Sequence, residues 1–159
     1  MNNYIIKIAL TNNDFLIAKK LFLKYSRSIK INLKFQHFES ELNEIDIQYN
    51  RPDGGLILMM NGEEAIGCIG VRKLENNIAE FKRMFVLESY RNKGIGTVLL
   101  QNAIKIARDL GYEKIRLDTL ESMRSAIKLY IKYGFYEIGA YRYNPHPDSR
   151  YFELDLVRQ

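Results

Sequence analysis

The stretch "RNKGIG" at residues 91–96, called here the glycine hinge, combines two basic side chains with two glycines. The residues after it repeat apolar side chains at helical spacing. Glycines let a ligand approach the backbone closely, because no side chain stands in the way. The first turn of a helix carries unpaired N–H groups and partial positive charge. The stretch therefore predicts a site that binds phosphate groups through the amides of Lys93 to Val98, with Arg91 adding attraction.

Two familiar phosphate-binding motifs do not fit the glycine hinge. A P-loop requires G-x-x-x-x-G-K-[ST], which the sequence lacks. The dinucleotide fingerprint G-x-G-x-x-G matches Gly94 and Gly96, but Leu99 occupies its third glycine position. A linker also separates the hinge from the strand that ends near Leu87, which the tight Rossmann turn does not tolerate. Asp118 would imitate the ribose-binding acid, but it lies inside a later strand, so this interpretation is discarded.

A third pattern, R/Q-x-x-G-x-G/A, fits residues 91–96, and its surroundings resemble the GNAT superfamily of acyl-CoA N-acyltransferases. In that family the pattern follows a strand that ends in a bulky residue and valine, here "MFV" at 84–86. The linker holds an acid and an aromatic residue, here "LESY" at 87–90, and a later "LY-x-x-x-GF" runs from Leu129 to Phe135. The resemblance implies acetyl transfer from acetyl-CoA to a primary amine, without a metal ion.

The resemblance also implies where the coenzyme binds. Its pyrophosphate would lie on the glycine hinge, and its pantetheine arm would enter a gap beside the strand 79–86, where that strand bulges. A backbone N–H of this strand would polarise the thioester carbonyl, as in an oxyanion hole. The residues expected to bind the coenzyme are Phe85, Val86, Arg91, Asn92, Lys93, Gly94, Ile95, Gly96 and Thr97.

Two residues are candidates for proton transfer by the same resemblance. Glu80 is the candidate base, acting directly or through water, and a partly buried carboxylate would have a raised pKa. The alternative is a structural acid paired with Lys82 or Arg83. Tyr130 is the candidate acid for the leaving thiolate, and its alternative role is packing with one hydrogen bond to the coenzyme. Tyr133 is a rival in the same helix, three residues from the motif position.

One position departs from the family pattern. Many members have an asparagine seven residues before the motif tyrosine, where it touches the coenzyme, but this chain has Met123. The role is therefore not transferred to Met123.

Glu80 and Tyr130 still favour catalysis over the alternative function, a non-catalytic acyl-CoA-binding regulatory domain on the same fold.

The elements that must position these residues alternate between strands and helices along one domain, residues 1–159. Strands are expected at 4–10, 56–60, 65–74, 78–87, 114–120, 135–138 and 151–156, and helices at about 15–25, 35–45, 95–110 and 125–133. This order predicts an α/β (α+β) fold with a mixed sheet. The GNAT resemblance makes it a mostly antiparallel sheet of about seven strands with helices on both faces.

In this fold the acceptor side is built from the first helices and the late hairpin, here residues 34–42 and 140–150. An arginine there would hold a carboxylate by two parallel hydrogen bonds. We therefore expect a small acceptor with an amine and a carboxylate, such as an amino acid or a short peptide. The alternative is that the arginine only pairs with a surface acid. The candidate acceptor residues are Gln36, Phe38, Arg142 and Asn144.

Composition limits the remaining functional classes. The chain of 159 residues is 47% hydrophobic and 27% charged, which is ordinary for a globular domain. Its net charge of +5 is scattered rather than gathered on a run, which argues against a nucleic-acid partner. The single cysteine, Cys68, excludes an internal disulfide. No stretch indicates a signal peptide or a membrane span, so we expect a cytoplasmic monomer or homodimer.

Overall fold

Seven strands build the central sheet of the protein, which a computed structural model describes for residues 3–29 and 31–158. The strands are β1 (Tyr4–Ile8), β2 (Gly55–Asn61), β3 (Glu64–Glu75), β4 (Ile78–Val86), β5 (Lys114–Leu120), β6 (Tyr136–Ile138) and β7 (Ser149–Asp155). They lie side by side in the order β1-β2-β3-β4-β5-β7-β6. Neighbours are antiparallel except β4 and β5, which are parallel. This mostly antiparallel sheet confirms the expected fold class.

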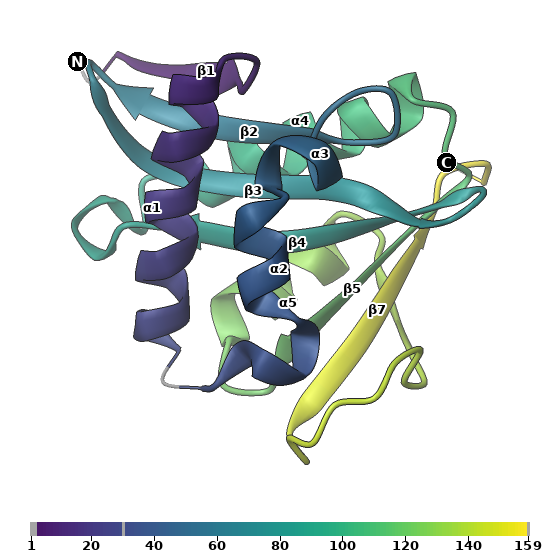
Figure 1. Cartoon of the computed structure of the whole chain (residues 1–159). Helices are drawn as coiled ribbons and strands as arrows, with labels where there is room; N and C mark the ends of the chain where they lie inside the picture. The colour runs from purple at the N-terminus through teal and green to yellow at the C-terminus, as the bar shows by residue number, and fades with distance from the viewer. Residues whose placement is uncertain (1–2, 30, 159) are drawn as a thin grey trace.

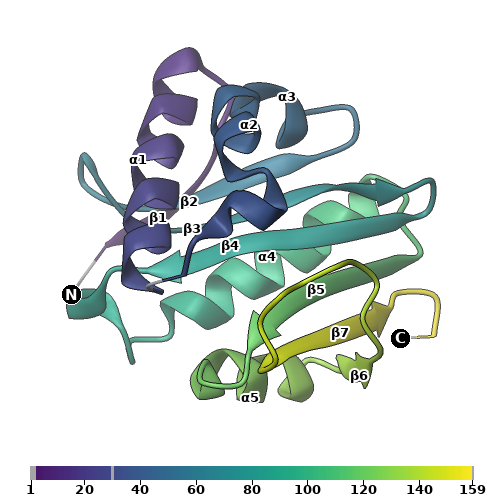
Figure 2. The same cartoon turned by 60° about the horizontal axis from the view of Figure 1, so that its bottom comes forward.

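Helices cover both faces of the sheet, as Figure 1 shows. One face carries α1 (Asn12–Ser28), the 3-10 helix η1 (Leu33–Gln36), α2 (Phe38–Asn43) and α3 (Ile45–Gln48), and the other carries α4 (Ile95–Asp109) and α5 (Arg124–Lys132). Figure 2 shows α1 and α4 on opposite sides of the strands. Each interface has its own hydrophobic core, one containing Leu99, Ile115 and Phe152, the other Phe22 and Leu58. The sheet is therefore buried on both sides near its centre.

The ends of the helices follow the local sequence. At the start of α1, the amide of Asp14 donates to Thr11 Oγ1 (3.1 Å) and the amide of Thr11 donates to Asp14 Oδ2 (3.0 Å), which forms a capping box. Gly111 and Gly134 follow α4 and α5 with φ of +88° and +96°. Glycine adopts such values without steric strain, so these two residues end their helices.

The expected second helix, residues 35–45, is wrong as a single element. His37, with a left-handed backbone and φ of +55°, separates η1 from α2, and Glu44, with φ of −113° and ψ of +20°, separates α2 from α3. A right-handed helix cannot continue through a left-handed residue such as His37. The last strand is also longer than expected, since it begins at Ser149 rather than at Tyr151.

A bulge interrupts β4 close to the point where it leaves β5. Phe85 pairs with Cys68 and Lys82 pairs with Gly70, so β4 has one residue more than β3 between these pairs. Arg83, inside the bulge, has φ of +60°. A bulge of this kind bends its strand and redirects its side chains. The bulge that the family resemblance implies is therefore present.

Strands β4 and β5 pair over a short length and then part. Ile78 to Glu80 pair with Lys114 to Arg116, and no later residues of the two strands pair. Figure 1 shows β4 and β5 adjacent at one end and splayed at the other. The opening between them is called the wedge here, and it is where the candidate site lies.

Candidate active site

A large groove of about 670 Å³ extends from the wedge to the start of α4. Its walls come from the end of β4, the glycine hinge, the start of α5 and the end of α1. Of the residues expected to bind the coenzyme, the groove is lined by Phe85, Val86, Arg91, Asn92, Gly94, Ile95, Gly96 and Thr97. Lys93 is not among the lining residues, and its ammonium lies 5.4 Å from the centre of the Tyr90 ring.

The start of α4 is suited to an anionic group. The first intrahelical bond there joins the Val98 amide to the Gly94 carbonyl at 3.2 Å. Among the described residues no side chain caps this end, so the amides of Ile95, Gly96 and Thr97 remain available to a ligand. Gly94 has φ of +80°, which allows the sharp entry into the helix. These residues therefore fit a pyrophosphate group bound at a helix start.

A second, smaller cavity, called the wedge cavity here, lies where β4 and β5 part. Its volume is about 40 Å³, which admits a small polar group. Tyr25, Ile29, Leu120 and Met123 line both the groove and the wedge cavity, so the two spaces meet at these residues. A ligand group in the wedge cavity would consequently face the inner end of a ligand in the groove.

Met123 lies at this junction, at the position where the family commonly has an asparagine. Its sulfur accepts a hydrogen bond from Thr119 Oγ1 at 3.4 Å. Its backbone precedes α5, whose first residue is Arg124. Methionine here supplies an apolar, adaptable wall, which a polar amide would not.

Three side chains from three elements form a closed ring of hydrogen bonds at the wedge cavity. Lys82 Nζ on β4 donates to Gln36 Oε1 on η1 and to Asp118 Oδ1 on β5, both at 3.0 Å. Gln36 Nε2 donates to Asp118 Oδ2 at 3.0 Å. The side chains of Lys82 and Asp118 are only 2% and 5% exposed. Of the expected acceptor residues, Gln36 and Asn144 line this cavity.

The other two expected acceptor residues lie outside the lining of both cavities. The Arg142 guanidinium donates through Nη2 to Glu80 Oε2, while its Nε is buried and has no partner among the described residues. The ring of Phe38 lies 5.1 Å from the Arg83 guanidinium and packs in the core beneath α2. Arg142 therefore remains close to the acceptor side, whereas Phe38 is a core residue that packs near Arg83.

Glu80 is completely buried and bound on both oxygens. Arg72 contacts Oε1 through Nε (3.0 Å) and Nη2 (2.9 Å), and Oε2 accepts from the Tyr141 hydroxyl (2.7 Å) and from Arg142. Burial alone would raise its pKa, but Lys82, Arg72 and Arg142 together hold the pKa of this carboxyl below its ordinary value. The expectation of a raised pKa for Glu80 is therefore wrong.

The structural alternative for Glu80 is also changed in detail. Its direct partners are Arg72 and Arg142 rather than Lys82 or Arg83. Arg83 instead binds Glu41 on α2, with Nε and Nη2 at 3.1 and 2.7 Å from the two carboxylate oxygens. This bidentate, buried pair holds the bulge of β4 against α2.

Tyr130 lies on α5 in the core behind the wedge. Its ring packs at 5.6 Å from the ring of Phe135. Burial raises the pKa of its hydroxyl, and the neighbouring Tyr25 and Asp118 raise it further. The hydroxyl is therefore protonated at neutral pH but is a weaker acid than an ordinary tyrosine, and Tyr130 is not among the residues that line the groove or the wedge cavity. The rival Tyr133 accepts a hydrogen bond from Gln101 at 2.8 Å, which places it against α4.

Sequence reasoning missed the residues that hold this site together. Arg72, Glu41 and Tyr141 were not singled out; Glu41 and Tyr141 act on residues distant in the sequence, whereas Arg72 lies directly opposite Glu80 on the neighbouring strand β3. Asp118 was considered only for a ribose and discarded. The signal that could have found it is its place on β5 opposite Lys82, since opposite charges on neighbouring strands pair where the strands are buried.

The described part of the chain lacks two further features, a metal-binding cluster and a membrane-spanning helix. Residues 3–29 and 31–158 contain no group of three or more histidine, cysteine, aspartate or glutamate side chains arranged to hold a metal ion. No helix within the same ranges has the length and apolar character needed to cross a membrane.

Comparison with known proteins places these features in context. Residues 23–135 match the model of the Acetyltransferase (GNAT) family. An uncharacterized N-acetyltransferase of Schizosaccharomyces pombe is 30% identical over 156 residues, covering 96% of this chain and 93% of that protein. The N-acetylaspartate synthetase of Xenopus tropicalis is 28% identical, over 90% of this chain and 53% of that protein. A GNAT acetyltransferase structure from Staphylococcus aureus has a TM-score of 0.77 at 28% identity, covering 96% of this chain and 99% of that one.

Proposed function

We propose, on the premise that this chain belongs to the GNAT family of acetyltransferases, that its acceptor is a small molecule with both an amine and a carboxylate. The reaction class follows from the family: the chain is an acetyl-CoA-dependent N-acetyltransferase. An amino acid or a short peptide meets the description of the acceptor. The alternative, a non-catalytic acyl-CoA-binding domain, is not favoured, because a second cavity opens onto the inner end of the groove.

The coenzyme is proposed to bind in the groove with its pyrophosphate at the glycine hinge. The free amides of Ile95, Gly96 and Thr97 support this placement. Arg91 supports it by its position, since its Nε donates to the Val86 carbonyl at 2.9 Å and fixes the hinge to the end of β4. The inner end of the groove would then bring the thioester to the wedge, beside the backbone of Phe85 and Val86.

The observation that carries the acceptor proposal is the Nε of Arg142. This nitrogen is buried and lacks a hydrogen-bond partner among the described residues. A buried donor without a partner is costly, and a carboxylate would satisfy it with a charge-assisted bond. Arg142 is on the 139–148 loop, whose Asn144 lines the wedge cavity. A carboxylate at Arg142 would therefore place the amine of the same small molecule at that cavity.

One relative supports the same class of acceptor. The Xenopus tropicalis protein is named for the synthesis of N-acetylaspartate, whose acceptor carries an amine and carboxylates. That protein is about twice as long as the matched region, so its activity supports a proposal for this chain and no more.

In the proposed reaction the acceptor amine attacks the thioester carbonyl directly. The backbone of β4 at the wedge stabilises the charge that develops on the carbonyl oxygen. Tyr130 is the proposed proton donor to the departing thiolate by the family pattern alone, since its raised pKa opposes this transfer and it is not among the residues that line the groove or the wedge cavity. Glu80 holds Arg142 and Tyr141 in place, and its role as the base stays a prediction. The molecule is proposed to work in the cytoplasm as a monomer or homodimer, without nucleic acid or membrane partners.

The test is a thiol-release screen with acetyl-CoA and matched pairs of acceptors. Each amino acid is compared with its own amide, which keeps the amine and removes the carboxylate. We expect kcat/KM to fall by about tenfold to a hundredfold from acid to amide, as for the loss of one charge-assisted bond of about 1.5–3 kcal/mol. Equal rates within the pairs, or a polyamine as the best acceptor, would contradict the proposal.

A further inference from the structure

The group that accepts the proton of the acceptor amine must be able to touch that amine. Glu80 does not line either cavity, and none of its surface is exposed. Both of its oxygens are already bound by Arg72, Tyr141 and Arg142. To reach an acceptor, Glu80 would have to leave at least one of these charged partners while still buried, which costs several kcal/mol.

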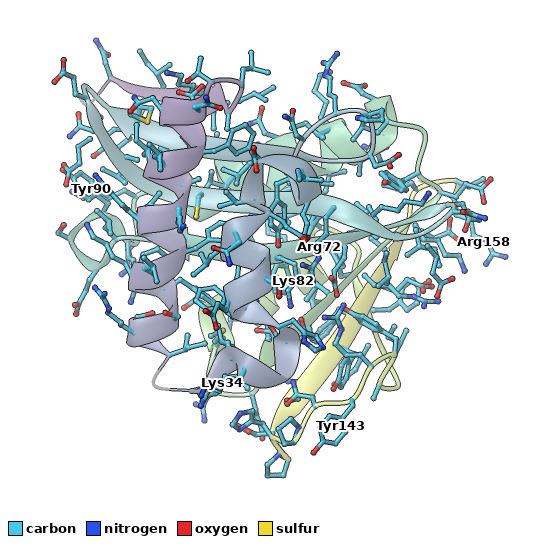
Figure 3. The ribbon with its side chains drawn as sticks, viewed as in Figure 1. Lys34, Arg72, Lys82, Tyr90, Tyr143 and Arg158 are labelled. Atoms are coloured by element: carbon cyan, nitrogen blue, oxygen red, sulfur yellow. The ribbon has the colours of Figure 1, made fainter. Side chains whose placement is uncertain are left out.

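Lys82 has the position that Glu80 lacks. It lines the wedge cavity, two residues beyond the last pair between β4 and β5. It precedes Met84 and Phe85 on the same strand, which line the groove. In Figure 3 Lys82 lies behind α2 near the centre of the molecule, whereas Lys34 and Tyr143 lie near its edge. Lys82 therefore stands between the acceptor side and the inner end of the groove.

The hydrogen bonds of Lys82 can be made by a neutral amine. Its Nζ has two acceptors, Gln36 Oε1 and Asp118 Oδ1, each at 3.0 Å. A neutral amine has two N–H donors and one lone pair, whereas an ammonium has three donors and no lone pair. With two acceptors bound, Nζ has one position left for a group in the wedge cavity, which is an N–H in the ammonium and the lone pair in the neutral amine.

The charges around Lys82 are compatible with the same state. Three guanidiniums pair with two of the three carboxylates in this cluster, Glu41 and Glu80, and the third carboxylate, Asp118, is paired with Lys82 itself. The basic members are Arg72, Arg83 and Arg142, from β3, β4 and the 139–148 loop, and the acidic members are Glu41, Glu80 and Asp118, from α2, β4 and β5. A charged Lys82 has Asp118 as its ion-pair partner, but it is also buried close to Arg83 and Arg72, so the cluster can lose the proton of Lys82 and keep its other ion pairs.

Opposing effects act on the pKa of Lys82. Burial lowers the pKa of its ammonium, and the nearby Arg83 and Arg72 lower it too, while Asp118 and Glu80 raise it. The net direction is downward. Lysine residues tuned in this way to a pKa of about 7–8 are effective bases. His146, from the loop, also lines the cavity and is therefore a rival to be tested.

We propose that Lys82, rather than Glu80, accepts the proton from the acceptor's amine, with Asp118 and Gln36 fixing its Nζ in the wedge cavity. The acceptor ammonium gives one proton to the lone pair of Nζ, and its nitrogen forms a bond to the thioester carbonyl carbon. The C–S bond then breaks, and the sulfur takes up a proton equivalent to the second one that the nitrogen loses. Lys82 returns its proton to water before the next turnover. This assignment rests on the proposed function, because it requires an amine acceptor.

The first experiment compares the pH dependence of kcat in four variants, with two acceptors whose amines differ in pKa. Lys82→Met removes the proton acceptor, and Lys82→Arg keeps a charge and donors but cannot act as a base near neutral pH. We expect kcat to fall by about 10²- to 10⁴-fold in both variants. In the wild type, kcat should rise with pH at a midpoint that is the same for both acceptors, and this rise should be absent from both variants. Glu80→Gln and His146→Gln should keep this rise, and Glu80→Gln should raise the acceptor KM.

Two controls keep this result interpretable. Calorimetry with coenzyme A and thermal unfolding show whether the variants are folded, since Lys82 is not part of the groove. Restored activity in Lys82→Arg would indicate a purely structural ion pair with Asp118 and would overturn the inference. The inference also fails if the rise disappears in Glu80→Gln or His146→Gln but persists in Lys82→Met.

The second experiment needs no acceptor, so it separates the two proposals. Lysine labelled with ¹³C at Cε is incorporated, and the Lys82 signal is assigned by its absence in Lys82→Arg. We expect its titration midpoint to lie clearly below the value of about 10.4 for an ordinary lysine. A midpoint near the ordinary value overturns the inference. If the wild type transfers acetyl groups to no amine while Lys82 titrates clearly below the ordinary value, the proposed acceptor class fails and the assignment of Lys82 as a neutral, buried base is retained.

Discussion

Replacement of Gly96 should move protein stability and coenzyme affinity in opposite directions. Gly96 is the second residue of α4, and a Cβ added there would lie 3.8 Å from Leu129 Cδ2, an ordinary contact. Gly96→Ala should therefore stabilise the free protein by about 0.5–1 kcal/mol through helix propensity. For a chain of this size that corresponds to a rise in Tm of roughly 1–4 °C. The same methyl group would stand where the pyrophosphate has to approach the backbone.

Gly96→Asp adds a negative charge to the same site. The free helix tolerates it, since an acidic group near a helix N-terminus contributes about 0.3–1 kcal/mol. Two like charges 4 Å apart repel by about 4 kcal/mol at an effective dielectric constant of 20. That repulsion would weaken coenzyme A binding by roughly a hundredfold to a thousandfold. Calorimetry measures the affinity, and thermal unfolding without ligand measures the stability.

The matched control is Gly94→Ala, two residues earlier. Nothing lies within 4 Å of a Cβ at Gly94, but its φ of +80° disfavours any residue with a side chain. This variant should lose about 1 kcal/mol of stability, the opposite sign to Gly96→Ala. If folded Gly96→Asp binds coenzyme A as the wild type does, the hinge is not the phosphate site and the reasoning is refuted.

Three other predictions concern single side chains. Arg142→Met should raise the acceptor KM by about tenfold or more while its effect on acceptor amides stays small, which steady-state kinetics on the matched pairs would show. Tyr130→Phe should lower kcat by ~10²-fold, and an unchanged kcat would assign this tyrosine to packing. Burial would raise the pKa of Asp14, but the amides of Leu10 and Thr11 and the ammonium of Lys7 hold it well below its ordinary value. Asp14→Asn should therefore cost about 1–2 kcal/mol at pH 7, and denaturant titrations should show this deficit shrinking as the pH falls below about 3.9, where the wild type begins to lose the same contribution.

The sheet and the long helices were predictable because their signals are local. Periodic apolar residues mark α1 and α4, and Thr11, Gly111 and Gly134 mark helix ends within a few positions. The division of residues 35–45 was not predictable in this way. It depends on the left-handed backbone of His37 and on the burial of Glu41 against Arg83, a residue far away in the sequence. Tertiary pairing decides the local conformation there.

The groove and the wedge cavity also differ in whether local sequence or tertiary pairing forms them. The groove could be predicted, because a phosphate site at a helix start is built from consecutive residues of one hinge. The wedge cavity could not, because Gln36, Lys82 and Asp118 come from three separate elements and meet only in the folded molecule. The pKa of Glu80 was also predicted with the wrong sign. The partners that lower it are Lys82 on the same strand, Arg72 on the neighbouring strand β3, and the distant Arg142, and together they outweigh the burial that was considered alone.

The charged residues of β4 explain why acceptor binding and proton transfer are separable in this fold. Each of them ties the strand to a different segment: Glu80 to the 139–148 loop, Lys82 to η1 and β5, and Arg83 to α2. The strand itself is fixed in the centre of the sheet, whereas η1 and the loop lie at its margin (Figures 1 and 2). Changes in the loop would alter which acceptor fits while leaving Asp118 on β5 to hold the nitrogen of Lys82, and changes in η1 that spare Gln36 would do the same. Substrate specificity should therefore follow η1 and the loop, and the pH dependence of the reaction should follow β4.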